Sequence, residues 1–497
     1  MIQMFLVFFG RIGTIFPAVK RPSRDLSPIE KVSWTLIVFA AYSLLISIPL
    51  IGAHVGEADP FAYLRVIYAP PLGYLGTLGI FPILLAGLIM RFILLRRTIN
   101  NDFTSVKGKA AYNASLKGMA ITFTILGAFL VMLGEYFGVN LTVDRQIIIF
   151  GQLVVGGIIA IYLDEIISKG WGYGSGIALF ILSTIGLDLF MYLFSVQAVL
   201  EGTNDILSNR GLILAFLSWI NQENVFAAIV ALLFRYDPQN NLVLPAYSLS
   251  SFLVTIIFFL LLNYIGAFKF KICIKDQPTE RQDCEYQGNI LFFLLIPVIL
   301  TSVMFSSISF LAQVVWNAGA SGGQKPPDIL VSLLGTFRAD HVSGQYVPES
   351  GLAYLLTPPQ SLIGDSGLIS PVDPLSALTR GIMYGLIFVG FSIYFLGQIL
   401  KPLDPERADI LMMLPVIGFF KIDSFSQNNN DILNNQPYQI RSARSWGLRF
   451  LVLLMIAQIL GLFTTAVGLY VCVAILKRYS EILDDDSRKF GILEFYL

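Results

Sequence analysis

Long apolar runs recur along most of the chain and are separated by shorter polar segments. A bilayer core about 30 Å thick is crossed by roughly 20 mainly apolar residues, because an α-helix satisfies its backbone polar groups without water. The pattern predicts ten spans. They are expected at residues 33–52, 76–95, 116–138, 146–166, 174–200, 249–268, 288–316, 377–400, 446–463 and 464–480. The sequence therefore predicts an all-α, polytopic membrane protein.

The segments between the spans differ in character. Residues 1–32 form the N-terminal segment, whose opening MIQMFLVFFG has neither a preceding basic region nor a cleavage site and is typical of an interfacial helix. Two loops, 201–248 and 318–374, are long enough to pack over the outer mouth. Residues 401–445 are polar with an Asn-rich centre, which on composition favours a flexible linker. Residues 481–497 are the C-terminal tail.

Lys and Arg are retained on the cytoplasmic side of a membrane, so their placement tests the span count. With the N-terminus inside, ten spans place 26 of the 33 Lys and Arg residues in cytoplasmic segments. A missed or invented helix before the middle of the chain scrambles this bias. The distribution therefore supports ten spans with both termini in the cytoplasm.

Composition narrows the function further. The chain has 497 residues, 55% hydrophobic and 13% charged, with a net charge of zero, so neither a soluble fold nor a nucleic-acid-binding protein is indicated. Three cysteines and two histidines make a zinc site or a disulfide framework improbable. No hydrolase, metalloprotease or nucleotide-binding motif is found in a sequence context that supports it. The sequence therefore indicates neither an enzyme nor a cofactor.

A solute transporter is the alternative class. Such proteins need charged or broken-helix sites near the bilayer midplane. The intramembrane charges found are Glu135, Asp164 and Glu165, all near span ends. A secondary transporter of a small solute is thus disfavoured but remains the alternative.

The run GWGYGSGI at 170–177 superficially resembles a phosphate-binding glycine loop. It follows a predicted transmembrane helix instead of a strand, and it lacks the Lys that such loops use. On composition, it is interpreted as a flexible start to the fifth span.

Several stretches, in order along the chain, resemble the SecY family of protein-conducting channels, in its archaeal and eukaryotic branch. They are FPAVKRP (16–22), DPFAYLRVIYA (59–69), LGIFPILLAGLIM (78–90), GWGYGSGIALFI (170–181), IPVIL (296–300), ILVSLLGTF (329–337), GLAYLLTPP (351–359) and DPERADILMML (404–414). The resemblance implies two pseudo-symmetric five-helix halves around a pore, residues 33–200 and 249–480. It also implies the central subunit of a translocase that passes unfolded secretory polypeptides and releases transmembrane segments sideways into lipid.

The resemblance assigns roles residue by residue. A pore ring of aliphatic side chains is expected at Ile80, Leu84, Ile177, Ile181, Ile299 and Leu469. A plug is expected at 59–69, with Asp59, Pro60, Phe61, Leu64, Arg65 and Val66. A lateral gate is expected between the second and seventh spans, tuned by Thr301 and Ser302. Cytoplasmic docking is expected at Lys269, Lys271, Lys275, Arg281 and Arg407. A flexible hinge is expected at the glycines of 170–176.

The resemblance also implies partners and a location. The expected partners are small gamma (SecE-type) and beta membrane subunits, a ribosome, a signal-recognition-particle receptor, nascent polypeptides and the lipid bilayer. No nucleic-acid recognition is predicted beyond ribosome docking. The chain departs from the family in two places: Thr464 to Gly468 replace the usual turn between the last two spans, and four acidic residues offset the basic loop 269–287. An archaeal plasma membrane is the favoured location, with the endoplasmic reticulum as the alternative.

Overall fold

The computed structural model describes most of the ten predicted spans and parts of the loops between them. The described residues are 2–53, 72–95, 106–134, 136–137, 141–196, 198–201, 206–209, 211–220, 229, 233, 248–267, 269–272, 286–318, 329–340, 345–358, 374–399, 437–460, 462 and 465–489.

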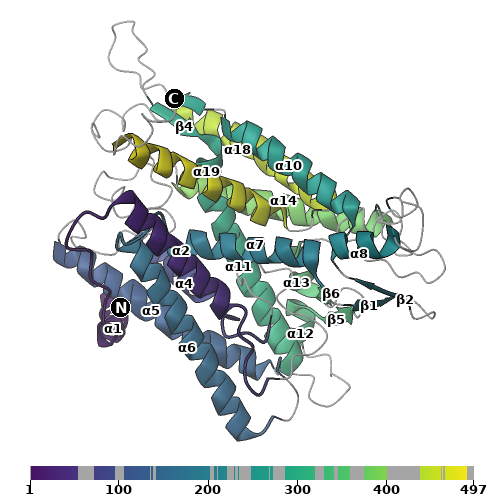
Figure 1. The fold of residues 1–497 in the computed structure, drawn as a ribbon, viewed down its shortest axis with the longest axis horizontal. Helices are drawn as coiled ribbons and strands as arrows, with labels where there is room; N and C mark the ends of the chain where they lie inside the picture. The colour runs from purple at the N-terminus through teal and green to yellow at the C-terminus, as the bar shows by residue number, and fades with distance from the viewer. Residues whose placement is uncertain are drawn as a thin grey trace, which may run out of the picture.

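Ten long helices lie at the ten predicted spans, which confirms an all-helical polytopic membrane protein (Figure 1). They are α2 (Pro28–Leu45), α4 (Phe81–Leu95), α5 (Val106–Leu133), α6 (Val143–Ser168), α7 (Gly176–Phe194), α10 (Leu249–Ala267), α11 (Ile290–Ala318), α14 (Pro374–Ile399), α18 (Pro437–Leu460) and α19 (Ala466–Lys489). Within the described residues, seven of these helices are long and apolar enough to cross a membrane, and α4 and α18 contain shorter apolar helices.

Smaller elements flank the spans. The opening segment is helical, as predicted, over α1 (Ile2–Ile15). Three short helices follow later, α8 (Leu212–Ile220), α12 (Ile329–Leu334) and α13 (Gly351–Leu356). Three antiparallel hairpins pair β1 (Ala198–Glu201) with β2 (Ile206–Asn209), β3 (Lys269–Ile272) with β4 (Tyr286–Asn289), and β5 (Phe337–Asp340) with β6 (Gln345–Pro348). The elements of the two long outer loops lie together, away from β4 (Figure 1).

The two halves of the chain share one packing plan. In the first half α2 packs on α7, α4 on α5, α5 on α6 and α6 on α7. In the second half the equivalent spans pack in the same way, α10 on α19, α11 on α14, α14 on α18 and α18 on α19. The halves meet where α4 and α5 contact α11 and where α7 contacts α19. This repeated pattern agrees with the expected pseudo-symmetry.

The first two spans are shorter than predicted because proline and glycine break the helices between them. Helix α2 ends at Leu45, since Pro49 has no backbone N–H to donate and restricts the residue before it. Gly73 and Gly79 have positive φ angles of 95° and 51°, which delays the start of α4 to Phe81. Backbone hydrogen bonds then join the two ends of this loop, with the N–H of Leu50 donating to the carbonyl of Gly73 at 2.8 Å.

Two other boundaries also differ from the prediction. The fifth span ends at Phe194 and not at residue 200, because β1 begins at Ala198 and pairs with β2. The tenth helix begins near the predicted residue but continues past 480 to Lys489. The helix extends into the segment predicted as a tail, where Arg478 pairs with Glu481 one turn later at 3.1 Å.

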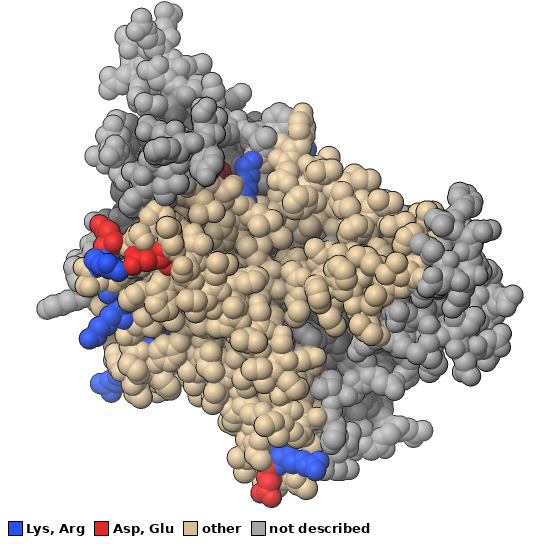
Figure 2. Space-filling model, viewed as in Figure 1, with Lys and Arg blue, Asp and Glu red and all other residues tan. Residues whose placement is uncertain are grey.

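The distribution of charged side chains indicates which surface of the protein faces the membrane. On the face drawn in Figure 2, the described charged side chains lie at the edges and a broad uncharged surface lies between them. Many large apolar side chains of the spans are exposed, among them Leu36, Phe129, Ile257 and Leu386. Exposed apolar side chains on long helices are stable against lipid and costly against water. The uncharged surface is therefore the lipid-facing belt.

Helix α1 packs against α5 with backbone touching backbone. A Cβ added to Gly13 would overlap the carbonyl oxygen of Ala114, and one added to Gly118 would overlap that of Phe9. These two pairs run in opposite directions along the helices, so α1 and α5 are antiparallel. Small residues allow such close approach between helices in membranes. The opening helix is thus fixed to the third span.

We predict that Gly118→Leu separates α1 from α5 and destabilises the protein by about 1–3 kcal/mol, the usual cost of overpacking. Thermal unfolding of the purified protein in detergent measures the effect. The matched control is Gly151→Leu on α6, where an added Cβ meets no atom within 4 Å. Equal melting temperatures for the two variants would contradict the contact.

Candidate functional site

Five of the six predicted ring residues lie on four helices that are neighbours in the fold, and the sixth, Ile80, directly precedes the first residue of α4. Helix α11 packs against α4 and α19, and α19 packs against α7. All six side chains are buried and belong to one continuous apolar core: Ile80, Leu84, Ile177, Ile181, Ile299 and Leu469. On α7, Ile177 and Ile181 are four residues apart and share a face. The arrangement agrees with the expected ring.

Polar side chains cap the first turns of two of these helices and so fix the residue at which each helix begins. At the start of α7 the backbone N–H of Ile177 donates to Oδ1 of Asp164 at 3.1 Å, so a buried carboxylate from α6 caps the helix. An anion is favourable there because the first N–H groups of a helix carry partial positive charge. At the start of α19, Oε1 of Gln458 accepts from the N–H of Ala466 at 2.7 Å. Leu469 follows within one turn of this cap.

The two predicted gate hydroxyls are held by their own helix. Thr301 donates to the carbonyl of Pro297 at 2.8 Å, and Ser302 donates to that of Val298 at 2.9 Å. Thr301 also accepts a hydrogen bond from Ser392 of α14 at 3.1 Å. Thr301 therefore contacts α14 within its own half, and the role of Thr301 and Ser302 in gating stays a prediction.

An aromatic pair forms the contact between the second and seventh spans. The rings of Phe81 on α4 and Phe310 on α11 pack edge to face, with centroids 6.3 Å apart, and both side chains are buried. Such a pair adds about 0.5–1.5 kcal/mol beyond its buried area. Neither residue could be singled out from the sequence, because both lie in apolar runs where an aromatic residue gives no local signal of a contact.

Several predicted site residues lie outside the described parts of the chain. These are the plug residues Asp59, Pro60, Phe61, Leu64, Arg65 and Val66, and the docking residues Lys275, Arg281 and Arg407. Lys269 and Lys271 lie on β3, paired with Asn289 and Gln287 of β4. Their roles stay predictions.

The glycines of 170–176 form a turn whose backbone angles and close contacts favour glycine, and their role as a hinge stays a prediction. Gly170 and Gly174 have positive φ angles of 95° and 79°, and a Cβ on Gly172 or Gly176 would overlap neighbouring atoms. The backbone N–H of Tyr173 donates to Oγ1 of Thr35 on α2 at 2.9 Å. These glycines serve turn geometry and close packing.

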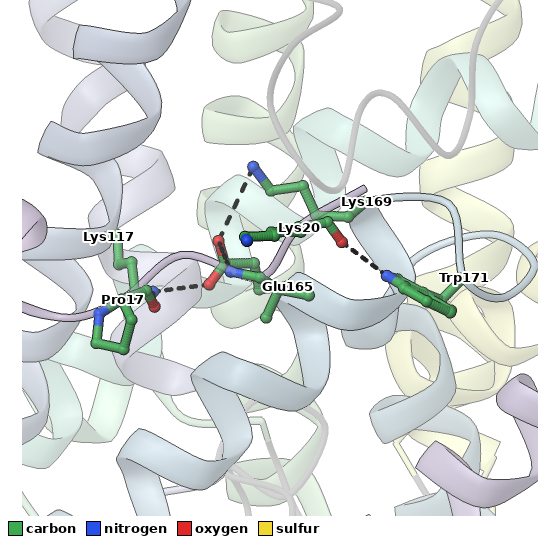
Figure 3. A network of polar contacts seen from close by, with 7 residues as sticks. Pro17, Lys20, Lys117, Glu165, Lys169 and Trp171 are labelled. Atoms are coloured by element: carbon green, nitrogen blue, oxygen red, sulfur yellow. Dashed lines mark hydrogen bonds and ion pairs between the residues drawn. The ribbon is translucent and has the colours of Figure 1, made fainter. Parts of the chain in front are cut away.

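A carboxylate on α6 joins the N-terminal segment to the spans (Figure 3). Glu165 pairs with Lys117 of α5 at 2.7 Å and accepts from the backbone N–H of Val19 at 3.2 Å. Lys117 also donates to the carbonyl of Pro17 at 2.8 Å. The indole of Trp171 donates to the carbonyl of Lys20 at 2.8 Å (Figure 3). We call this set of contacts the Glu165 clamp.

The clamp was missed because its members are far apart in sequence. The carboxylate was noted only as a charge near a span end, and Lys117 was counted for topology. In the fold the two side chains are 14% and 10% exposed, so the pair is largely shielded from water. Breaking an ion pair that is shielded from water costs more free energy than breaking an exposed one, because the remaining charge stays poorly solvated. The clamp fixes the segment that resembles the family's N-terminal signature.

The sequence analysis also left out Asp188, an acidic residue inside the fifth span. It follows Ile181 by seven residues, or about two helical turns, and thus lies on the same face of α7. Its side chain is half-buried. A helical wheel of the predicted span would have found it.

These features define a class of protein. A ten-helix membrane bundle has two similarly packed halves, and buried aliphatic side chains from four neighbouring helices lie where those halves meet. This architecture is that of a polytopic channel with an apolar constriction.

Comparison with known proteins gives the family. A sequence profile of the SecY family matches residues 75–407, and the chain belongs to that family. It is 25% identical over 497 residues to the Sec61 subunit alpha of Dictyostelium discoideum, a protein transport protein, with 98% of both chains covered. The fold is similar to that of a protein-conducting channel, with a TM-score of 0.68, 24% identity and 96% of both chains covered. It is also similar to Sec61 in a canine ribosome–channel complex from the endoplasmic reticulum, with a TM-score of 0.66, 24% identity and 96% coverage of both chains.

Membership of this family makes the chain a transport protein and not an enzyme, as the sequence predicted.

We predict that Lys117→Met destabilises the protein by about 1–3 kcal/mol, because it leaves the largely shielded Glu165 carboxylate with only the more distant cation of Lys169, 3.9 Å away. Thermal unfolding in detergent measures the change. The matched control is Arg24→Met, which breaks an ion pair with Glu30 whose arginine side chain is 73% exposed, and it should cost less than about 1 kcal/mol. Similar losses for both variants would show that the clamp contributes no more than a surface pair.

Proposed function

We propose that this chain is the channel-forming subunit of a Sec translocon and that its six buried aliphatic residues form the seal of the pore. The observation that carries the proposal is the placement of five of these buried residues on α4, α7, α11 and α19, four neighbouring helices of a SecY-family bundle, with Ile80 directly before α4. The substrate is an unfolded polypeptide, which passes through the seal, and apolar segments leave sideways into lipid.

An aliphatic seal suits a channel for polypeptides. Water that enters a narrow aliphatic constriction gives up hydrogen bonds of the bulk liquid, and an ion gives up hydration that nothing in the ring replaces. Flexible Ile and Leu side chains can still move aside for a thick and chemically varied chain. The seal therefore blocks ions without a charged filter.

The plug is proposed to be the segment 59–69, as the family resemblance implies. The described ends of its loop support this role, because Leu50 and Leu75 are tied across the loop by hydrogen bonds to Gly73 and Ile48 at 2.8 Å each. A small closing segment needs a modest input of free energy from the substrate to move.

The lateral gate is proposed to lie between α4 and α11, where the two halves contact each other. The pair Phe81–Phe310 lies in that contact. Opening there separates one aromatic pair and the apolar surface around it. A hydrophobic segment in the pore can replace those contacts with its own, so opening is favoured by the substrates that need it.

Cytoplasmic partners are proposed to bind the loops 269–287 and 401–445. Lys269, Lys271, Lys275, Arg281 and Arg407 supply positive charge for a ribosome or a targeting receptor. The relative in the canine complex is bound to a ribosome, which supports this partner. Small gamma and beta membrane subunits complete the proposed assembly.

The chain is a multi-pass membrane protein. The sequence alone favoured an archaeal plasma membrane, with the endoplasmic reticulum as the alternative. The similar canine complex comes from the endoplasmic reticulum, and the Dictyostelium relative is a eukaryotic Sec61 subunit, so these two proteins support the alternative. We therefore propose the endoplasmic reticulum membrane as the location.

We predict that the double variant Ile177→Asn, Ile181→Asn raises the resting ion conductance and relaxes the demand for a hydrophobic signal sequence, because polar side chains allow the constriction to wet. Single-channel recording in planar bilayers gives the conductance. The control is Phe190→Asn on the same helix, a side chain 57% exposed on the lipid-facing side. A double variant as tight as the wild type, with a leaking control, would place the seal on the wrong face of α7.

We predict that joining α4 to α11 blocks the release of transmembrane segments. Phe81→Cys and Phe310→Cys are introduced after the three native cysteines are replaced, and a short bis-maleimide links them. The control links Phe305→Cys to Phe388→Cys, whose rings are 5.8 Å apart within the C-terminal half. Insertion assays should show loss of insertion for the first pair and none for the second. Normal insertion through a channel linked at both Phe positions would rule out this gate.

A further inference from the structure

The side chains of α11 have known directions, because two of its contacts and one exposed side chain are defined. Phe305 packs against aromatic rings of α14, including that of Phe388 at 5.8 Å. Phe310 packs against α4, and Leu311 is 45% exposed on the outside of the bundle. Taking about 100° per residue, Phe310 lies about 140° and Leu311 about 240° round the helix from Phe305. The interval between Phe305 and Phe310 thus faces the interior, opposite the lipid.

Four residues occupy the middle of this interior face. Counted from Phe305, they lie about 60–120° round the helix. They are Ile299, Ser302, Ser306 and Gln313. Their spacing of three, four and seven residues is that of one helical face. The face begins with the proposed seal residue and continues toward the outer end of α11 with two hydroxyls and an amide.

The amide end of this face is buried without a partner. Gln313 is 2% exposed, and its Nε2 makes no hydrogen bond within the described structure. A buried amide without a partner costs about 1–3 kcal/mol, so its position needs a reason. A matching polar residue lies on α7, where Asp188 follows Ile177 and Ile181 along the seal-bearing face. Polar groups therefore follow the seal on two of its four helices.

We propose that the face formed by Ser302, Ser306 and Gln313 is a hydrogen-bonding track for the backbone of the polypeptide that has passed the seal. The ligand is the peptide group itself, which every substrate carries whatever its side chains. Gln313 can donate from its amide NH₂ to a peptide carbonyl and accept from a peptide N–H, Ser306 can do either, and Ser302, whose hydroxyl donates to the carbonyl of Val298, can accept. The inference rests on the proposed function, because it needs a chain in the pore.

The track answers a physical need. An extended chain leaving an apolar ring carries unpaired N–H and C=O groups, each costly without a partner. Polar groups on a rigid helix offer partners that exchange as the chain advances. Because each bond is worth about 1 kcal/mol net, the track holds no single position strongly.

Photocrosslinking tests the track. The photoreactive amino acid p-benzoylphenylalanine replaces Ser306 or Gln313 in turn, and a secretory polypeptide with a folded C-terminal domain is stalled in the reconstituted channel. Ile299 serves as the positive control within the seal, and Leu311 serves as the control on the lipid face of the same helix. We expect crosslinks to the stalled chain from Ile299, Ser306 and Gln313, and several-fold weaker ones from Leu311.

A functional variant gives a second measurement. Gln313→Leu keeps the volume and removes the amide, and it should slow transit of a secretory polypeptide roughly fivefold, the factor expected for about 1 kcal/mol. Crosslinks from Ile299 without any from Ser306 and Gln313, or unchanged transit in Gln313→Leu, would overturn the track while leaving the channel intact. Failure of translocation in the wild type, with no crosslink from Ile299, would overturn the proposed function instead.

Discussion

The lack of hydrogen-bonding partners in lipid is the constraint on which the rest of this structure depends. It makes ten helices the means of crossing the bilayer, and it requires each helix end to find partners inside the protein. Asp164 supplies one for α7 at 3.1 Å, and Gln458 supplies one for α19 at 2.7 Å. Because these caps set where each helix begins, they also set the direction of Ile177 and Leu469. The helix caps therefore also position two of the residues proposed to form the pore seal.

One face of α11 has two proposed functions, which are to exclude water at one point and to bind peptide groups at another. At Ile299 an aliphatic side chain excludes water, since nothing polar is present to replace the hydration of an ion. Two to four turns further on, Ser306 and Gln313 place polar atoms where an emerging backbone needs them. A uniform apolar face would hold the chain's peptide groups at high cost, and a uniform polar face would leak. The order of residues along the helix separates the two demands.

The sequence predicted the spans because apolar length is a local property, whereas the ring residues were expected from the family resemblance and their role stays a prediction. Helix breaks near Pro49 and Gly79 shifted boundaries by several residues, although each is a recognisable local signal. The Glu165 clamp could not be predicted, because Val19, Lys117 and Glu165 meet only through tertiary packing. Composition also cannot distinguish a glycine that allows a bend from one that admits a neighbour's backbone, as Gly176 admits that of Asp164. The contact between Thr301 and Ser392 could not be predicted, because the two residues lie on different spans that meet only in the fold.

Where the molecule can move follows from where it is fixed. In the N-terminal half, backbone contact joins α1 to α5, the Glu165 clamp joins α5 to α6, and Thr35 joins α2 to the turn before α7. These contacts are short range and tightly packed, so this half moves as a unit. Toward the other half, α7 meets α19 where Tyr479 donates to the carbonyl of Tyr173 at 3.2 Å, and α4 meets α11 through the pair Phe81–Phe310. The turn that carries Tyr173 bonds to Thr35 of α2 and to Tyr479 of α19, so it contacts both halves. We therefore expect motion that opens the proposed pore to fall on the boundary between the halves, where the aromatic pair should separate more easily than the clamp because its separation exposes no charge.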